Sequence, residues 1–260
     1  MEKFDRALED FNTGIRLNPD ILEGYISRGQ VLLDSTKYEE AIQNFSYVIQ
    51  KNPYFPEAYH DRGLALQSLG KLSEALHDLD SAIRLNPENT NFYNTRGYIK
   101  QESGDIEGAL SDFNRSIEID PKNTSPYLNR AKIRKDLKDL EGALHDYIHI
   151  RTLEPNNVHS YIEAGLCYME QKNYEQALTE YKKGLEYHPK NPFLLFNQGS
   201  VYHSLGRREL AFQNYNNALF YKPDLAEVYN NRGTLRRESG GDWNETMADY
   251  QKAKETDPTN

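Results

Sequence analysis

The sequence has little cysteine and no long apolar run. Its 260 residues include one cysteine, Cys167, so no disulfide can form within the chain. This favours a reducing compartment, and we expect a cytoplasmic protein. No stretch approaches the roughly 20 consecutive apolar residues of a membrane helix, and the first residues, MEKFDRALEDF, contain no apolar signal core. We therefore expect no association with a membrane.

Positive charge is also scarce. The chain has 31 Lys and Arg against 40 Asp and Glu, which gives a formal charge of −9 and a pI of about 5.4. Nucleic-acid binding requires a basic face, so we expect no nucleic-acid partner. The composition, 37% hydrophobic and 27% charged, is polar for a globule. It is normal for a solenoid, in which each repeat buries surface only against its neighbours.

Proline marks a regular period along the sequence. It returns every 34 residues, and an eighth copy, Pro258, comes one residue late. The regular positions are Pro19, Pro53, Pro87, Pro121, Pro155, Pro189 and Pro223. A fixed period of this length is the signature of a repeat array.

Other positions repeat in phase with the prolines. The eighth residue of each unit is small: Gly29, Gly63, Gly97, Ala131, Gly165, Gly199 and Gly233. Glycine costs about 0.5–1 kcal/mol in a helix interior, so its return favours close approach of two helices. Later in six of the seven full units an alanine is followed four residues on by a larger residue, as in Ala41 and Phe45, whereas the last unit has Thr246 in place of the alanine. This spacing places both on one face of a second helix.

These residues resemble the tetratricopeptide repeat family, whose pattern is an aromatic residue, a glycine, alanine–aromatic–alanine on the second helix, and a terminal proline. The resemblance covers essentially the whole chain. It implies an all-α fold, a right-handed superhelical solenoid of helix-turn-helix repeats. First helices would line a concave groove, and second helices would form the outer wall.

The same resemblance predicts one continuous array over residues 1–260. Residues 1–21 would hold the second helix of a partial repeat. Gly240-Gly241 inserts one residue and makes the last repeat irregular. The full repeats are predicted at 22–55, 56–89, 90–123, 124–157, 158–191, 192–225 and 226–260. The missing first helix and the absence of a capping helix after Asn260 favour a segment of a longer array.

Patterns that carry chemistry are weak. Cys167 occupies a position that is apolar in the other units, which favours a core residue over a nucleophile. His145 and His149 have a spacing that can bind a metal, but no glutamate lies between them as in metalloproteases. No glycine-rich phosphate loop is present. We predict no enzymatic activity, no cofactor and no metal.

Arginine stands at the seventh position of five units: Arg28, Arg62, Arg96, Arg130 and Arg232. These residues could form a basic ladder. Alternatively, each could pair with an acid on the second helix of its own unit. Candidate acids are Asp78, Asp112, Asp146 and, after the insertion, Asp249, whereas Arg28 faces Asn44. We favour the pairs, which would fix the geometry of the two helices.

The resemblance places partner binding on the first helices. Asparagine side chains both donate and accept, so a row of them can bond an extended peptide backbone without reading its sequence. The alternative is that each is merely a tolerated solvated residue. The predicted groove residues are Asp61, Asn94, Thr95, Tyr98, Asn129, Lys132, Glu163, Asn197, Asn230 and Asn231.

We predict a non-catalytic protein–protein interaction scaffold that binds a peptide or helical segment of a partner in the groove. The clamp for acidic C-terminal tails of heat-shock chaperones needs lysine at the fifth position and asparagine at the ninth, and both are absent. Such tails are not expected partners. Two alternatives stay open: a regulatory or substrate-recruiting module of a larger enzyme or multi-domain protein, and a scaffold that self-assembles into a homo-oligomer through uncapped ends.

Overall fold

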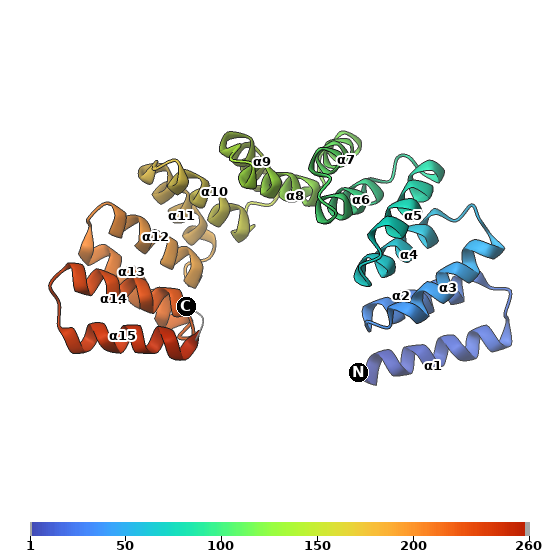
Figure 1. Cartoon of the computed structure of the whole chain (residues 1–260), viewed down its shortest axis with the longest axis horizontal. Coiled ribbons are helices and arrows are strands. Elements are labelled where there is room, and N and C mark those ends of the chain that lie inside the picture. The colour runs from blue at the N-terminus through green and yellow to red at the C-terminus, as the bar shows by residue number, and fades with distance from the viewer. Residues whose placement is uncertain (1, 258–260) are drawn as a thin grey trace. The chain divides into compact units, whose positions relative to one another are not determined.

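The computed structural model describes residues 2–257, with side chains from Phe4 onward, so Pro258 and Asn260 lie outside the described residues. The described residues form fifteen α-helices and no strand (Figure 1). The all-α class predicted from the sequence is confirmed. The helices alternate between two sets that occupy successive places in the 34-residue period.

The first helices are α2 (Leu22–Asp34), α4 (Pro56–Ser68), α6 (Thr90–Glu102), α8 (Thr124–Asp136), α10 (Val158–Glu170), α12 (Pro192–Ser204) and α14 (Ala226–Glu238). The second helices are α1 (Glu2–Leu17), α3 (Tyr38–Lys51), α5 (Leu72–Leu85), α7 (Ile106–Ile119), α9 (Leu140–Leu153), α11 (Tyr174–Tyr187), α13 (Arg208–Tyr221) and α15 (Trp243–Thr256).

The chain divides into two compact units, Met1–Ile133 and Arg134–Asn260. The division falls inside α8. Within the first unit, first and second helices pack in sequence from α1 to α7, and the second unit repeats this from α9 to α15. The single continuous array over residues 1–260, with its repeat boundaries, stays a prediction.

The turn from first to second helix contains a residue with positive φ in every pair. Four of these residues are glycine, as in Gly70 with φ of 72°. The others are Thr36, Lys138 and Lys172, with φ of 63°, 66° and 59°. The left-handed region suits glycine and strains other residues by about 1 kcal/mol or more. The period therefore fixes the turn conformation even where the residue does not favour it.

The recurring glycines bring the two helices of each pair together. A Cβ added at Gly29 would lie 2.6 Å from the Phe45 ring, and a Cβ added at Gly97 would lie 2.8 Å from the Phe113 ring. Gly165 and Gly199 meet Tyr181 and Tyr215 in the same way. These rings are buried, so they cannot move aside without opening the core. The close approach predicted from the glycine period is confirmed.

Arg62, Arg96 and Arg232 pair with the aspartates predicted for them, whereas the pair of Arg130 with Asp146 stays a prediction. Arg96 donates from Nε and Nη2 to Asp112 at 2.8 and 2.6 Å, and the same two-bond geometry joins Arg62 to Asp78 and Arg232 to Asp249. The predicted exception is also confirmed, because Arg28 donates to Asn44 at 2.8 Å.

Each of these arginines also reaches back to the preceding second helix. Arg96 Nη1 donates to Asp80 on α5 at 2.7 Å, and Arg62 Nη1 donates to Ser46 on α3 at 3.0 Å. One guanidinium therefore links three consecutive helices. This contact was not predicted from the sequence, although the partner stands 16 residues before the arginine each time.

Cys167 on α10 is a core residue, as its position in the repeat predicts. The side chain is buried, and burial raises the pKa of the thiol to about 11. A thiol in this environment stays protonated at neutral pH.

Candidate partner-binding surface

The first helices contact one another directly inside each unit. In the first unit α2 contacts α4 and α4 contacts α6, and in the second unit α10 contacts α12 and α12 contacts α14. Polar residues on neighbouring first helices therefore come within hydrogen-bonding reach. We call the ten predicted groove residues the first-helix row. Those from Asp61 to Lys132 lie in the first unit, and those from Glu163 to Asn231 in the second.

Asp61 and Thr95 belong to a hydrogen-bonded network between helices. Gln30 Nε2 donates to Asp61 Oδ2 at 3.0 Å, and His60 Nδ1 lies 2.9 Å from Asp61 Oδ1. The other ring nitrogen of His60 lies 3.1 Å from Thr95 Oγ1. Asp61 is buried, so its carboxylate is satisfied within the chain and orients His60.

Asn94 and Asn129 form an amide pair. Asn129 Nδ2 donates to Asn94 Oδ1 at 3.0 Å, and both side chains are half-buried. An asparagine amide carries two N–H donors and one carbonyl oxygen. The pair therefore keeps donors on Asn94 and an acceptor on Asn129 in addition to the bond that joins them.

Tyr98 and Lys132 extend this pair along the same helix faces. Tyr98 follows Asn94 by four residues on α6, and Lys132 follows Asn129 by three residues on α8. Side chains three or four residues apart lie on one face of a helix. Tyr98 is 48% exposed, and Lys132 is also exposed. We call Asn94, Tyr98, Asn129 and Lys132 the α6–α8 patch.

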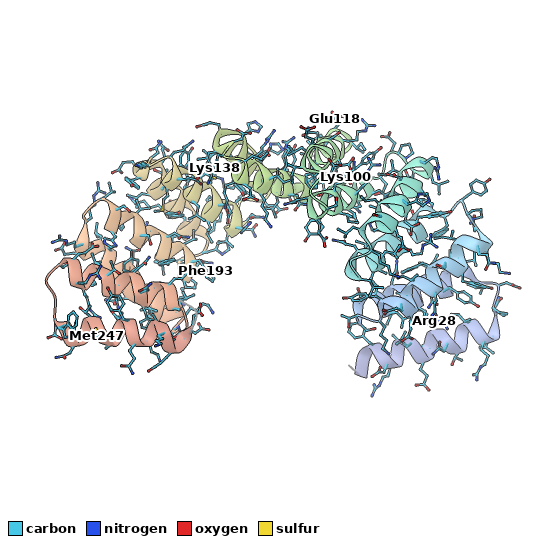
Figure 2. The ribbon with its side chains drawn as sticks, in the orientation of Figure 1. Arg28, Lys100, Glu118, Lys138, Phe193 and Met247 are labelled. Atoms are coloured by element: carbon cyan, nitrogen blue, oxygen red, sulfur yellow. The ribbon has the colours of Figure 1, made fainter. Side chains whose placement is uncertain are left out.

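The second unit presents fewer paired groups. Lys135 donates to Glu163, and Asn231 forms a side-chain hydrogen bond with Tyr215. Asn230 is half-buried on α14. Asn197 on α12 is half-buried, and its side chain makes no hydrogen bond within the described part of the chain. Phe193, four residues earlier on the same helix, is exposed (Figure 2).

Several pairs that connect first helices share one sequence separation. His60 with Thr95, Asn94 with Asn129, Gln67 with Glu102, and His203 with Glu238 are all 35 residues apart. Sequence reasoning missed Gln67, Glu102 and Glu238 because each is an ordinary solvated residue when read alone. They could have been predicted by looking for residues of complementary type 35 residues apart, which is one residue more than the repeat period.

The described residues contain neither a cluster of metal ligands nor a helix that could span a membrane. Within residues 2–257, no three His, Cys, Asp or Glu side chains are grouped so that they could hold a metal ion. Over the same residues, none of the helices combines the length and apolar character that crossing a membrane requires.

Models of known families match the chain at several places. One described as TPR repeat matches residues 29–70, 165–206 and 199–240. Two described as Tetratricopeptide repeat match residues 56–89 and 90–123. These matches together cover residues 29–123 and 165–240, and the chain belongs to the tetratricopeptide repeat family.

Solved structures of similar fold are also tetratricopeptide repeat proteins. The C-terminal part of a TPR repeat-containing protein from Cytophaga hutchinsonii matches with a TM-score of 0.71 at 18% identity, over 89% of this chain and 95% of that one. A tetratricopeptide repeat protein from Parabacteroides merdae matches with a TM-score of 0.67 at 19% identity, over 91% and 93%. YrrB, described as a TPR protein with an unusual peptide-binding site, matches with a TM-score of 0.58 at 20% identity, over 71% and 95%. No curated protein matches the chain in sequence.

Proposed function

We propose that this protein is a non-catalytic interaction scaffold whose first-helix row binds an extended segment of a partner protein. Membership of the tetratricopeptide repeat family supports a protein-interaction role. The peptide-binding site named for one structure of similar fold supports a peptide-like ligand. The observation that carries the proposal is the amide pair of Asn94 and Asn129.

The amide pair matches the chemistry of a peptide backbone. An extended segment presents alternating N–H and C=O groups, which need acceptors and donors in turn. Asn129 Oδ1 offers an acceptor and Asn94 Nδ2 offers donors, on helices that the pair itself holds together. Neither group reads side chains, so this contact binds backbone irrespective of sequence.

The rest of the α6–α8 patch supplies selectivity. Tyr98 is an exposed aromatic residue beside the amides, and rings of this kind add large apolar contact with little loss of side-chain freedom. Lys132 is exposed and has no partner within the described residues, so it favours an acidic residue in the bound segment. We therefore propose a ligand with an apolar residue and a nearby carboxylate.

The double variant Asn94→Ala/Asn129→Ala tests this role. Two backbone hydrogen bonds contribute about 0.5–1.5 kcal/mol each, so we expect affinity for the partner segment to fall about tenfold or more. The intact chain would capture a partner, overlapping peptides would locate the bound segment, and calorimetry would measure its affinity for each variant.

Asn217→Ala is the matched control, because Asn217 is an exposed asparagine on the second helix α13 without a side-chain partner in the described part of the chain. It should leave affinity unchanged. Equal affinities for the double variant, the control and the wild-type chain would refute the role of the amide pair.

A further inference from the structure

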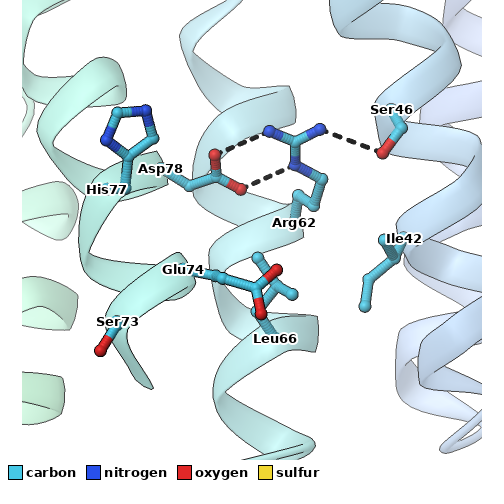
Figure 3. A pocket seen from close by; sticks show the side chains of 8 residues that line it. All are labelled: Ile42, Ser46, Arg62, Leu66, Ser73, Glu74, His77 and Asp78. Carbon is cyan, nitrogen blue, oxygen red and sulfur yellow. Dashed lines mark hydrogen bonds and ion pairs between the residues drawn. The ribbon is translucent and has the colours of Figure 1, made fainter. Parts of the chain in front are cut away.

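A pocket of about 460 Å³ opens among α3, α4 and α5 in the first unit. Figure 3 shows its lining side chains, with Arg62 at its centre. The lining residues are Ile42, Ser46, Arg62, Leu66, Ser73, Glu74, His77 and Asp78. Its volume falls within the ordinary range for ligand pockets, about 300–1,000 Å³. None of these residues belongs to the first-helix row.

Two carboxylates and one guanidinium set the charge of this pocket. Arg62 donates from Nε and Nη2 to the two oxygens of buried Asp78, at 2.7 Å each, and these hydrogen bonds raise the pKa of Arg62. The Arg62–Asp78 pair is therefore neutral as a unit. Glu74, one turn before Asp78 on α5, is exposed and has no hydrogen bond or ion pair within the described residues. The pocket therefore lacks one positive charge for neutrality.

The same constellation in the last helix pair contains that missing cation. After the one-residue insertion, Asp249 and Glu245 on α15 correspond to Asp78 and Glu74 on α5. Arg236 on α14 binds both of them: Nη1 lies 2.5 Å from Asp249 Oδ2, and Nη2 lies 3.3 Å from Glu245 Oε2. The chain thus shows directly that a carboxylate pair at this place holds a guanidinium.

Other helix pairs also supply a cation from the position of Arg236 to the buried aspartate. Lys100 Nζ lies 2.9 Å from Asp112 Oδ2, and Arg134 Nη1 lies 2.8 Å from Asp146 Oδ2. Leu66 stands at the corresponding position on α4. Its apolar side chain leaves the second cation position beside Asp78 unfilled by the chain itself.

We propose that this pocket binds the guanidinium of an arginine side chain on a partner protein. Glu74 and Asp78 accept from its N–H groups as Glu245 and Asp249 accept from Arg236, and Leu66 and Ile42 contact its aliphatic stem. A guanidinium suits the site because its planar fork can donate to two carboxylates at once. This second contact goes beyond the first-helix row and would anchor a partner on the second helices.

The probe is the blocked peptide acetyl-Gly-Gly-Arg-Gly-Gly-amide, and its control is the same peptide with citrulline, which keeps the shape of arginine without the charge. Amide shifts of the full chain are followed by NMR as each peptide is added. We expect the arginine peptide to shift Ser46, Leu66 and Glu74 with a dissociation constant on the order of 1 mM. The citrulline peptide should bind about tenfold more weakly or not at all.

Two variants assign the binding to this pocket. Leu66→Arg supplies the cation from within, as Arg236 does, and should weaken the arginine peptide about tenfold or more. Glu74→Gln alters only an exposed side chain and should weaken it about fivefold. If the arginine peptide shifts no lining residue, if citrulline binds equally well, or if Glu74→Gln binds as the wild type does, the proposal is wrong. The Asn94→Ala/Asn129→Ala variant should bind the arginine peptide normally, which separates this test from that of the first-helix row.

Discussion

Replacing Gly165 by alanine is expected to lower the free energy of unfolding by about 3 kcal/mol. In a helix interior this change ordinarily stabilises by about 1 kcal/mol. Here the new Cβ would overlap the ring of Tyr181 on α11, and that ring is fully buried. The ring cannot rotate away without separating α10 from α11. Urea unfolding of wild type and variant, followed by circular dichroism, measures the difference.

Gly14→Ala is the control for this prediction, because a Cβ at Gly14 on α1 would meet nothing within 4 Å. It should raise the free energy of unfolding by about 0.5–1 kcal/mol. Gly165→Ala should also be less costly in a Tyr181→Leu background, where the overlapping ring is gone. A stabilising effect of Gly165→Ala in the wild-type chain would show that the close approach of α10 and α11 is not needed.

Asp112→Ala is expected to destabilise the chain by about 3 kcal/mol, at the lower end of the range for breaking a buried ion pair. The buried carboxylate of Asp112 accepts from Arg96 at 2.8 and 2.6 Å and pairs with Lys100 at 2.9 Å. Removal leaves both cations without this acceptor. The lower end applies because Arg96 retains 18% exposure and keeps its contact with Asp80. Thermal and urea unfolding measure the loss.

Asp112→Asn should cost much less, about 1 kcal/mol. The chain itself places asparagine at the corresponding position, where Asn44 accepts from Arg28 at 2.8 Å. Asp80→Ala removes the more exposed partner of Arg96, which is 59% exposed, and should cost less than 1 kcal/mol. Equal losses for Asp112→Ala and Asp80→Ala would mean that burial of the carboxylate does not determine its contribution.

Much of the fold follows from the sequence because its determinants recur at a fixed phase. Two kinds of position repeat: the glycines that face Phe45, Phe113 and Tyr181, and the arginines that face Asp78 and Asp112. Because these positions are independent of one another, their agreement predicts how the two helices of each repeat are aligned. The turn conformation at Lys138 and Lys172 was not predictable from residue type, because lysine does not favour positive φ. It follows from the period, since both residues stand one or more periods from Gly104.

The candidate surface was predictable as a row of positions but not as a set of contacts. Nothing in the residue types alone shows that Asp61 on α4 is buried and hydrogen-bonded to Gln30 and His60, whereas Tyr98 on α6 is exposed. These outcomes depend on which side chains on the next first helix reach back, about one period away. The pocket beside Asp78 was not predictable from the sequence, because it depends on an apolar residue, Leu66, standing where other helix pairs have a cation.

Photo-crosslinking from three exposed positions to a captured partner segment tests directly whether the first-helix row binds the partner. A photoreactive phenylalanine would replace one of three residues in turn. Tyr98 lies on α6 and is 48% exposed. Tyr54 and Phe220 lie outside the first helices and are 78% and 79% exposed. If the first-helix row binds the partner, Tyr98 gives a crosslink to the segment while Tyr54 and Phe220 give none. Crosslinks from Phe220 or Tyr54 without one from Tyr98 would show that the partner binds outside the first-helix row.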